Sequence, residues 1–218
     1  MTWVKICGNT TLADAQLAVE LGANALGFIF AESKRRVTPA HVATITAHLP
    51  DDIERVGVVY SRDAAEIASI VREAGLTVVQ LHGGLDLPLL QQLRDRLGKE
   101  ADLIQTLHWV IGSESGQRLR EEMDRIASLR LVDRILVDSK VGSLGGGTGV
   151  AFDWKAAREL FQRDDLKVIV AGGLKPENVR EAIRELEPWG VDVSSGVEAS
   201  PGQKDPDKLR AFLGAAKG

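Results

Sequence analysis

Short runs of β-branched and other apolar residues alternate along the chain with longer segments in which apolar residues recur every three or four positions. The short runs are typical of buried parallel strands, and the longer segments are typical of amphipathic helices. The short runs predict strands over Trp3–Cys7, Ala25–Phe30, Arg55–Tyr60, Thr77–His82, Leu103–Leu107, Arg134–Asp138, Lys167–Ala171 and Val191–Ser194. The periodic segments predict helices over Thr11–Leu21, Asp63–Ala74, Leu87–Leu97, Trp154–Phe161, Pro176–Leu186 and Pro206–Ala216.

Residues typical of helix boundaries support these elements. Pro39 and Pro176 can each occupy the first position of a helix, where proline fits because its missing N–H is not needed. Asp63 and Asp205 can cap helix N-termini, and Gly75 follows a predicted helix end. The alternation of strands with helices therefore extends over the chain.

The number of strand–helix units indicates the fold class. Eight units favour an α/β protein with a closed, parallel (β/α)8 barrel over an open doubly wound sheet, which usually has five or six strands. With 218 residues and no linker or change in composition, residues 1–218 are expected to form a single domain. The polar segments Gly112–Gly116 and Gly142–Gly149 are predicted to be loops on the functional face of this barrel.

Composition and charge restrict the classes of function. The net charge of −4 and the lack of a basic stripe make nucleic acid an unsuitable partner, whereas a small anionic substrate needs only local positive groups. Cys7 is the only cysteine, which excludes an intramolecular disulfide and a multi-cysteine metal site and fits a reducing cytoplasm. No signal peptide and no apolar run of membrane-spanning length is found, so no membrane association is expected. A monomer and a homodimer both remain open.

Strand alternation predicts which side chains enter the barrel. In the first strand Val4 and Ile6 suit the helix layer, which directs Lys5 and Cys7 inward, and the same reasoning directs Asp192 inward. Buried ionisable groups are costly unless they pair or take part in chemistry. Lys5 is expected to pair with Asp192 or Asp138 in a buried network, with a structural role.

Three more polar side chains are predicted to face the same space. Gln80, His82 and Asp138 alternate with apolar neighbours, and the last two lie at the carboxyl ends of their strands. Cys7 and Asp138 could act as a base and an acid at the barrel mouth, although a lone cysteine is more often a small buried apolar residue. His82 could transfer a proton or bind substrate, or it could cap a loop.

Two glycine-bearing turns late in the chain predict a phosphate site. Gly172-Gly173 follows the seventh strand, and Ser195-Gly196 follows the eighth. Barrel enzymes commonly bind phosphate with these two loops, because backbone N–H groups approach an anion closely where no Cβ intervenes. The run Gly145–Gly149 is interpreted as a loop that folds over the ligand, with a flexible connector as the alternative.

Several motifs together resemble the phosphoribosylanthranilate isomerase family over nearly the whole chain. They are Val4-Lys5-Ile6-Cys7-Gly8-Asn9-Thr10, Ala25-Leu26-Gly27-Phe28-Ile29-Phe30, Gln80-Leu81-His82-Gly83, Leu136-Val137-Asp138-Ser139-Lys140, Gly146-Gly147-Thr148-Gly149, Gly172-Gly173-Leu174 and Val191-Asp192-Val193-Ser194-Ser195-Gly196-Val197-Glu198. The resemblance implies an Amadori rearrangement of N-(5-phosphoribosyl)anthranilate in tryptophan biosynthesis, with a phosphorylated aminosugar as substrate and with no metal or organic cofactor.

The resemblance also implies residue roles. Asp138 corresponds to the general acid and Cys7 to the general base, whose thiolate Lys5 or a helix dipole could help to form. Arg35 corresponds to the arginine that binds the anthranilate carboxylate, and Asp192 and His82 are expected to line the ligand. The phosphate loops correspond to Gly172, Gly173, Ser195 and Gly196.

Two departures from the family pattern leave questions open. The loop Ala31–Arg36 is one residue shorter than usual, so either Arg35 or Arg36 could bind the carboxylate. Thr106–Trp109 is atypical at the end of the fifth strand, and Trp109 could stack on the substrate or only pack in the core.

Other functions also fit the sequence. One is an isomerase for the related aminoimidazole ribonucleotide of histidine biosynthesis, or for both substrates; that enzyme usually has aspartate where this chain has Cys7. A barrel that binds a phosphorylated ligand without catalysis is a second alternative, and the presence of both Cys7 and Asp138 argues against it. A metal-dependent epimerase is disfavoured, because His41, His48, His82 and His108 are not expected to meet carboxylates inside the barrel.

Overall fold

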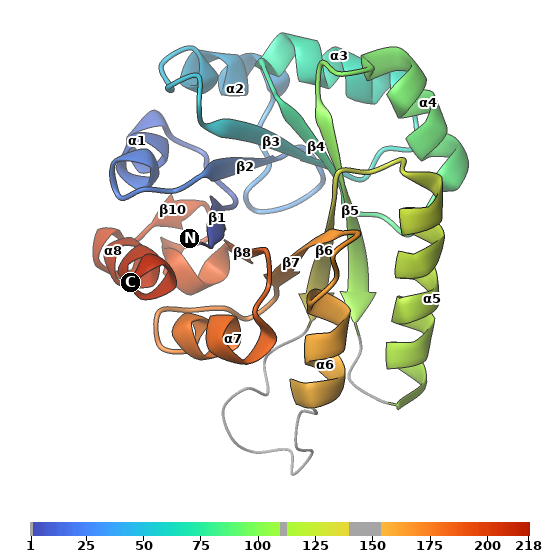
Figure 1. The fold of residues 1–218 in the computed structure, drawn as a ribbon. Helices are drawn as coiled ribbons and strands as arrows, with labels where there is room; N and C mark the ends of the chain where they lie inside the picture. Colours follow the sequence, from blue (N-terminus) through green and yellow to red (C-terminus); the bar gives the residue numbers. More distant parts are fainter. Residues whose placement is uncertain (1, 110–112, 140–153) are drawn as a thin grey trace.

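The structure, a computed structural model, describes residues 2–109, 113–139 and 154–218. In these parts of the chain eight parallel strands close into a barrel in sequence order, with β1 hydrogen-bonded to both β2 and β8 (Figure 1). The strands are β1 (Trp3–Ile6), β2 (Ala25–Ile29), β3 (Glu54–Val59), β4 (Val78–Leu81), β5 (Asp102–Trp109), β6 (Arg134–Ser139), β7 (Lys167–Ala171) and β8 (Gly190–Val193). The predicted (β/α)8 fold is confirmed.

Helices surround the barrel on the outside (Figure 1). They are α1 (Leu12–Glu20), α2 (Pro39–Thr46), α3 (Ala64–Ala74), α4 (Leu87–Leu97), α5 (Ser113–Leu129), α6 (Trp154–Phe161), α7 (Val179–Leu186) and α8 (Pro206–Lys217). Asp63 and Asp205 cap α3 and α8 as predicted, each accepting hydrogen bonds from two backbone N–H groups. No helix in the described ranges is long and apolar enough to cross a membrane.

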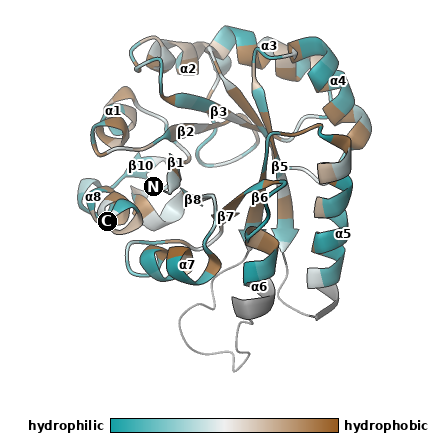
Figure 2. Cartoon of the chain, viewed as in Figure 1, coloured by the Kyte–Doolittle hydropathy of each residue, from teal (hydrophilic) through white to brown (hydrophobic). Residues whose placement is uncertain are grey.

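Two apolar layers stabilise the barrel. The larger lies between the strands and the helices, whose residues change from hydrophobic to hydrophilic around each helix (Figure 2). The smaller fills the barrel interior with one or two side chains from each of the strands β1 to β7: Trp3, Ala25, Val56, Val78, Ile104, Leu136, Ile169 and Ala171. Every second residue of a strand points inward, as the sequence pattern predicts.

Arg134 closes the amino-terminal end of the barrel. Its guanidinium lies 5.3 Å from the ring centroids of both Trp3 and Trp189 and forms ion pairs with Glu54 (2.5 Å) and Asp102 (2.6 Å). The cation is therefore desolvated between two aromatic rings and compensated by two carboxylates. The functional groups described below lie at the opposite end of the strands.

Some local predictions are wrong. Gly112–Gly116 was predicted to be a loop, but α5 begins at Ser113, because the buried residues Leu119, Met123 and Ile126 define an apolar face behind a polar first turn. The helix predicted from Pro176 begins only at Val179. The Gly145–Gly149 loop lies outside the described residues.

The late start of α7 has a local cause. The side chain of Asn178 accepts a hydrogen bond from Lys175 N and donates one to Gly173 O, which holds the preceding residues in a turn. After β8 the chain forms a 3₁₀ turn (Ser195–Val197) and a small antiparallel pair, β9 (Glu198–Ser200) and β10 (Gln203–Lys204), which the sequence pattern did not reveal.

Candidate active site

The carboxyl-terminal ends of the strands surround a cavity of about 520 Å³. Eight of the nine predicted site residues line it: Cys7, His82, Asp138, Gly172, Gly173, Asp192, Ser195 and Gly196. Ile29, Val58 and Tyr60 contribute an apolar wall that sequence reasoning missed, although the inward parity of the second and third strands could have indicated it. The cavity thus combines ionisable groups, glycine turns and an apolar surface.

Lys5 lies below this cavity and is completely buried. Its Nζ atom is 2.8 Å from Asp192 Oδ1, and the two residues are direct neighbours in the β1–β8 register. Burial lowers the pKa of Lys5, but attraction to Asp192 and to Cys7 outweighs burial and leaves the pKa above its ordinary value. The lysine is therefore charged, and of its two predicted partners it pairs with Asp192.

Cys7 lies at the end of β1, between Lys5 and the cavity. Gly27 on the neighbouring strand makes room for both residues, because a Cβ atom there would lie 2.7 Å from Cys7 Sγ and 3.0 Å from Lys5 Cε. Burial raises the pKa of the Cys7 thiol, and the opposing effect of Lys5 does not overcome it. The group is therefore a neutral thiol. Lys5 lowers the thiol pKa, as predicted, but not enough to produce a thiolate.

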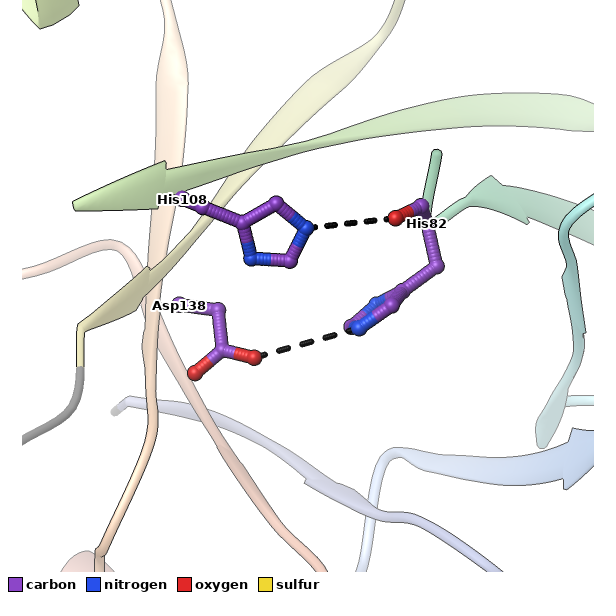
Figure 3. A group of neighbouring side chains, drawn as sticks. All are labelled: His82, His108 and Asp138. Atoms are coloured by element: carbon purple, nitrogen blue, oxygen red, sulfur yellow. Dashed lines mark hydrogen bonds and ion pairs between the residues drawn. The ribbon is translucent and has the colours of Figure 1, made fainter. Parts of the chain in front are cut away.

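His82 and Asp138 face each other across the cavity mouth, with 3.9 Å between His82 Nε2 and Asp138 Oδ2 (Figure 3). Burial lowers the pKa of His82 to about 4, so the imidazole is neutral near pH 7. His108 joins them, with its ring 5.0 Å from that of His82. The expectation that no histidines meet a carboxylate at the barrel interior is wrong, because residue 108 has the inward parity on β5.

Trp109, by contrast, faces outward. It is buried in the hydrophobic layer between strands and helices and is not among the residues that line the cavity in the described structure. Of the two alternatives for this side chain, packing in the core is therefore the one observed.

Arg35 lies behind the cavity wall, and within the described structure it is the one predicted site residue outside the lining. Its guanidinium forms a bidentate ion pair with Glu198, with Nε–Oε1 at 2.8 Å and Nη2–Oε2 at 2.6 Å. Arg35 is half-buried, whereas Arg36 is exposed and forms a backbone bridge with Ile29. This orientation favours Arg35 over Arg36 as the residue near the site.

Glu198 is a buried acidic residue whose contacts sequence reasoning missed. Besides Arg35 it contacts Lys204, whose Nζ lies 3.1 Å from Glu198 Oε1 and donates a hydrogen bond to the Cys7 carbonyl oxygen at 2.5 Å. Burial raises the pKa of Glu198, but its two cationic partners outweigh burial and hold the pKa below its ordinary value. Glu198 thus connects the arginine to the backbone of β1.

The two glycine turns have the backbone geometry expected of an anion cradle. Gly172 and Gly173 have φ angles of 95° and 64°, in the left-handed region that favours glycine. A Cβ atom at Gly196 would lie 1.9 Å from Leu174 O, so only glycine allows the two turns to approach this closely. Both turns line the same cavity as Cys7 and Asp138.

A closed barrel with a glycine-lined cradle after β7 and β8, and with a thiol and a carboxylate at the same mouth, defines the class of phosphate-binding (β/α)8 enzymes that use acid–base chemistry. The family model for N-(5'-phosphoribosyl)anthranilate (PRA) isomerase matches residues 4–215. The chain belongs to this family.

Individual relatives support the assignment. An N-(5'-phosphoribosyl)anthranilate isomerase of Trichlorobacter lovleyi is 42% identical and aligns over 100% of this chain and 98% of its own. A phosphoribosylanthranilate isomerase solved with reduced 1-(o-carboxyphenylamino)-1-deoxyribulose 5-phosphate has a TM-score of 0.80 at 36% identity, covering 100% of this chain and 99% of its own. Monomers generated from a dimeric isomerase of Thermotoga maritima give a TM-score of 0.78 at 35% identity, with 100% of both chains covered.

Proposed function

We propose that this protein catalyses the Amadori rearrangement of N-(5-phosphoribosyl)anthranilate to 1-(2-carboxyphenylamino)-1-deoxyribulose 5-phosphate in tryptophan biosynthesis. The observation that carries the proposal is the presence of Cys7, Asp138 and both glycine turns in one cavity of about 520 Å³. Family membership and the named relatives agree with this activity. The reaction requires two proton transfers and a phosphate anchor, which these groups can supply.

In the proposed reaction Asp138 is the general acid. It protonates the furanose ring oxygen, and the C1′–O bond breaks to give an open-chain Schiff base. Cys7 then removes the proton from C2′ to give an enolamine, which tautomerises to the ketone. Each transfer needs a group at the substrate, and both residues line the cavity.

The raised pKa of Cys7 determines when this residue can act as a base in the second step. A buried neutral thiol is a poor base, but the Schiff base formed in the first step is protonated on nitrogen and places a positive charge inside the cavity. An opposite charge favours the thiolate, so after ring opening Cys7 would release its thiol proton to solvent at the cavity mouth and then accept the proton from C2′. Lys5 assists in the same direction, whereas Asp192 opposes it.

Substrate recognition is assigned to three further groups. The turns with Gly172, Gly173, Ser195 and Gly196 would bind the phosphate through backbone N–H groups. Arg35 would bind the anthranilate carboxylate, either while it keeps its ion pair with Glu198 or after that ion pair breaks. His82 and Asp192 would contact the sugar from the cavity wall.

Several further properties are part of the proposal. Residues 1–218 act as one domain in the cytoplasm, without nucleic acid, a membrane, a metal or an organic cofactor in the reaction. The protein works as a monomer or a homodimer; the Thermotoga maritima relative is described as dimeric.

The test follows the fluorescence decay of phosphoribosylanthranilate with purified protein in EDTA, corrected for spontaneous breakdown of the substrate. Cys7→Ser and Asp138→Asn should each lower kcat by about 10²-fold or more, with a much smaller change in KM. His48→Gln, an exposed change on the outer surface, is the control. Near-native turnover by either site variant would refute the assigned roles, and no turnover by the wild type would redirect the search to the aminoimidazole ribonucleotide substrate.

A further inference from the structure

Two histidines and the proposed general acid form a cluster at the cavity mouth. One ligand atom each from His82, His108 and Asp138 lies within 4.8 Å of the other two (Figure 3). The residues come from the carboxyl ends of β4, β5 and β6, three neighbouring strands, so the barrel itself fixes their arrangement. His108 belongs to the Thr106–Trp109 segment that departs from the family pattern, and the proposed isomerisation assigns it no role.

The hydrogen bonding of His108 prepares it as a ligand. Its Nε2 atom lies 3.2 Å from the backbone oxygen of His82, and because a carbonyl only accepts, Nε2 carries the proton. The lone pair is then on Nδ1, which Figure 3 shows on the side of Asp138. A histidine whose second nitrogen donates to a backbone carbonyl is the usual arrangement in metal sites.

The spacing and access also suit a metal ion. Ligand atoms around a tetrahedral zinc ion are about 3.4 Å apart, given bonds of about 2.1 Å. The 3.9 Å between His82 Nε2 and Asp138 Oδ2 is close to this spacing, and all three ligand atoms lie within 4.8 Å of one another, so side-chain adjustments of about 1 Å would bring them to it. His108 is exposed, and the side chains of His82 and Asp138 are 22% and 31% exposed, so an ion can enter from solvent and keep a water ligand.

We infer that His82, His108 and Asp138 form a binding site for one divalent transition-metal ion of the zinc type, and that an ion bound there reversibly inhibits the isomerase. Two imidazoles and one carboxylate are ligands that zinc and neighbouring transition metals prefer over magnesium or calcium. The metal would hold Asp138 as a coordinated carboxylate, which cannot carry the proton that ring opening needs, and binding to the protonated form would release that proton. The inhibition rests on the proposed function, whereas the binding site does not.

The experiment titrates Zn²⁺ into chelator-treated protein by calorimetry, with no substrate, and compares His108→Gln with the matched control His48→Gln. We expect one ion per chain for the wild type, a loss of affinity of at least about 10-fold for His108→Gln, and a change within about 2-fold for His48→Gln. Co²⁺ should give visible absorption bands typical of a four-coordinate site in the wild type and in His48→Gln, but not in His108→Gln.

Kinetics test the inhibition separately. Zn²⁺ should inhibit the wild type at the concentrations that saturate the calorimetric site, EDTA should restore the rate, and His108→Gln should need at least about 10-fold more Zn²⁺, relative to its own metal-free rate. Equal zinc affinity in the two histidine variants, or loss of binding in Cys7→Ser while His108→Gln binds normally, would overturn the site. If the wild type binds zinc at this cluster but turns over no phosphoribosylanthranilate, the proposed function fails and the site stands.

Discussion

Replacing Asp192 with asparagine should destabilise the barrel strongly, because it leaves a buried charge without its partner. Lys5 is 0% exposed and its Nζ lies 2.8 Å from Asp192 Oδ1, so the ammonium has no access to water. Removing one partner of a buried ion pair typically costs about 3–5 kcal/mol, since the remaining ion keeps its desolvation penalty. For a chain of this size such a loss lowers Tm by about 10 °C.

The assay is equilibrium unfolding in urea at pH 7, with Lys5→Met, Asp192→Asn and the double variant completing a cycle. The double variant removes both charges and should lose at least about 1 kcal/mol less than the sum of the single losses. Glu100→Gln is the control, because its pair with Arg72 spans 3.4 Å between side chains that are each 58% exposed, and it should cost no more than about 1 kcal/mol.

Two results would refute this reasoning. One is an Asp192→Asn variant as stable as Glu100→Gln, and the other is strict additivity in the cycle. Raising the pH should also recover stability in Asp192→Asn, because a buried Lys5 without a partner is less costly when it is neutral. The pKa of Lys5 in the folded variant would then lie below its unfolded value, so the free energy of unfolding increases with pH up to the unfolded value. A wild-type-like pH profile in the variant would mean that Lys5 finds another counterion.

Three further predictions concern the site. Iodoacetamide should alkylate Cys7, the single cysteine, at a rate that still increases above pH 9 in the ligand-free protein, because burial raises the pKa of the thiol. A rate profile with its midpoint near pH 7 would contradict this prediction. Glu198→Gln should raise KM more than it lowers kcat, since it removes the bidentate pair that holds Arg35 in position, and an unchanged KM would argue against a role of Glu198 in positioning Arg35. Gly196→Ala should weaken inhibition by inorganic phosphate about 10-fold or more, because its Cβ would lie 1.9 Å from Leu174 O; unaltered inhibition would move the phosphate elsewhere.

The sequence predicts the barrel well because its strands combine a short apolar run with polar residues at alternating positions. Buried parallel strands are apolar on both faces, and in this chain the polar residues Lys5, Gln80 and Asp192 have inward parity, whereas the buried Gln105 of β5 has outward parity. The helix around Leu119 and Met123 was missed because its first turn is polar and resembles a loop, whereas tertiary packing of the later turns determines the element.

The site residues could be located from the sequence, but their partners could be predicted only in part. Parity places Lys5 and Asp192 in the interior, and only the β1–β8 register makes them direct neighbours. Arg35 and Glu198 are 163 positions apart, and their ion pair depends on the turn after β8, which has no periodic pattern. Local patterns report which face a residue occupies, while pairing depends on barrel closure, a property of all eight strands together.

The interior of the barrel consists of layers that differ in polarity along its axis. Next to the Arg134 ion pairs that close the amino-terminal end, Trp3, Val56 and Ile104 form an apolar layer. The Lys5–Asp192 pair comes next, and its cost is tolerable because the two charges satisfy each other. At the mouth, Cys7 and Asp138 face the cavity, where a substrate can contact both groups. Because Asp138 both lines the cavity and lies beside His82 and His108, catalysis and metal inhibition are expected to involve the same carboxylate.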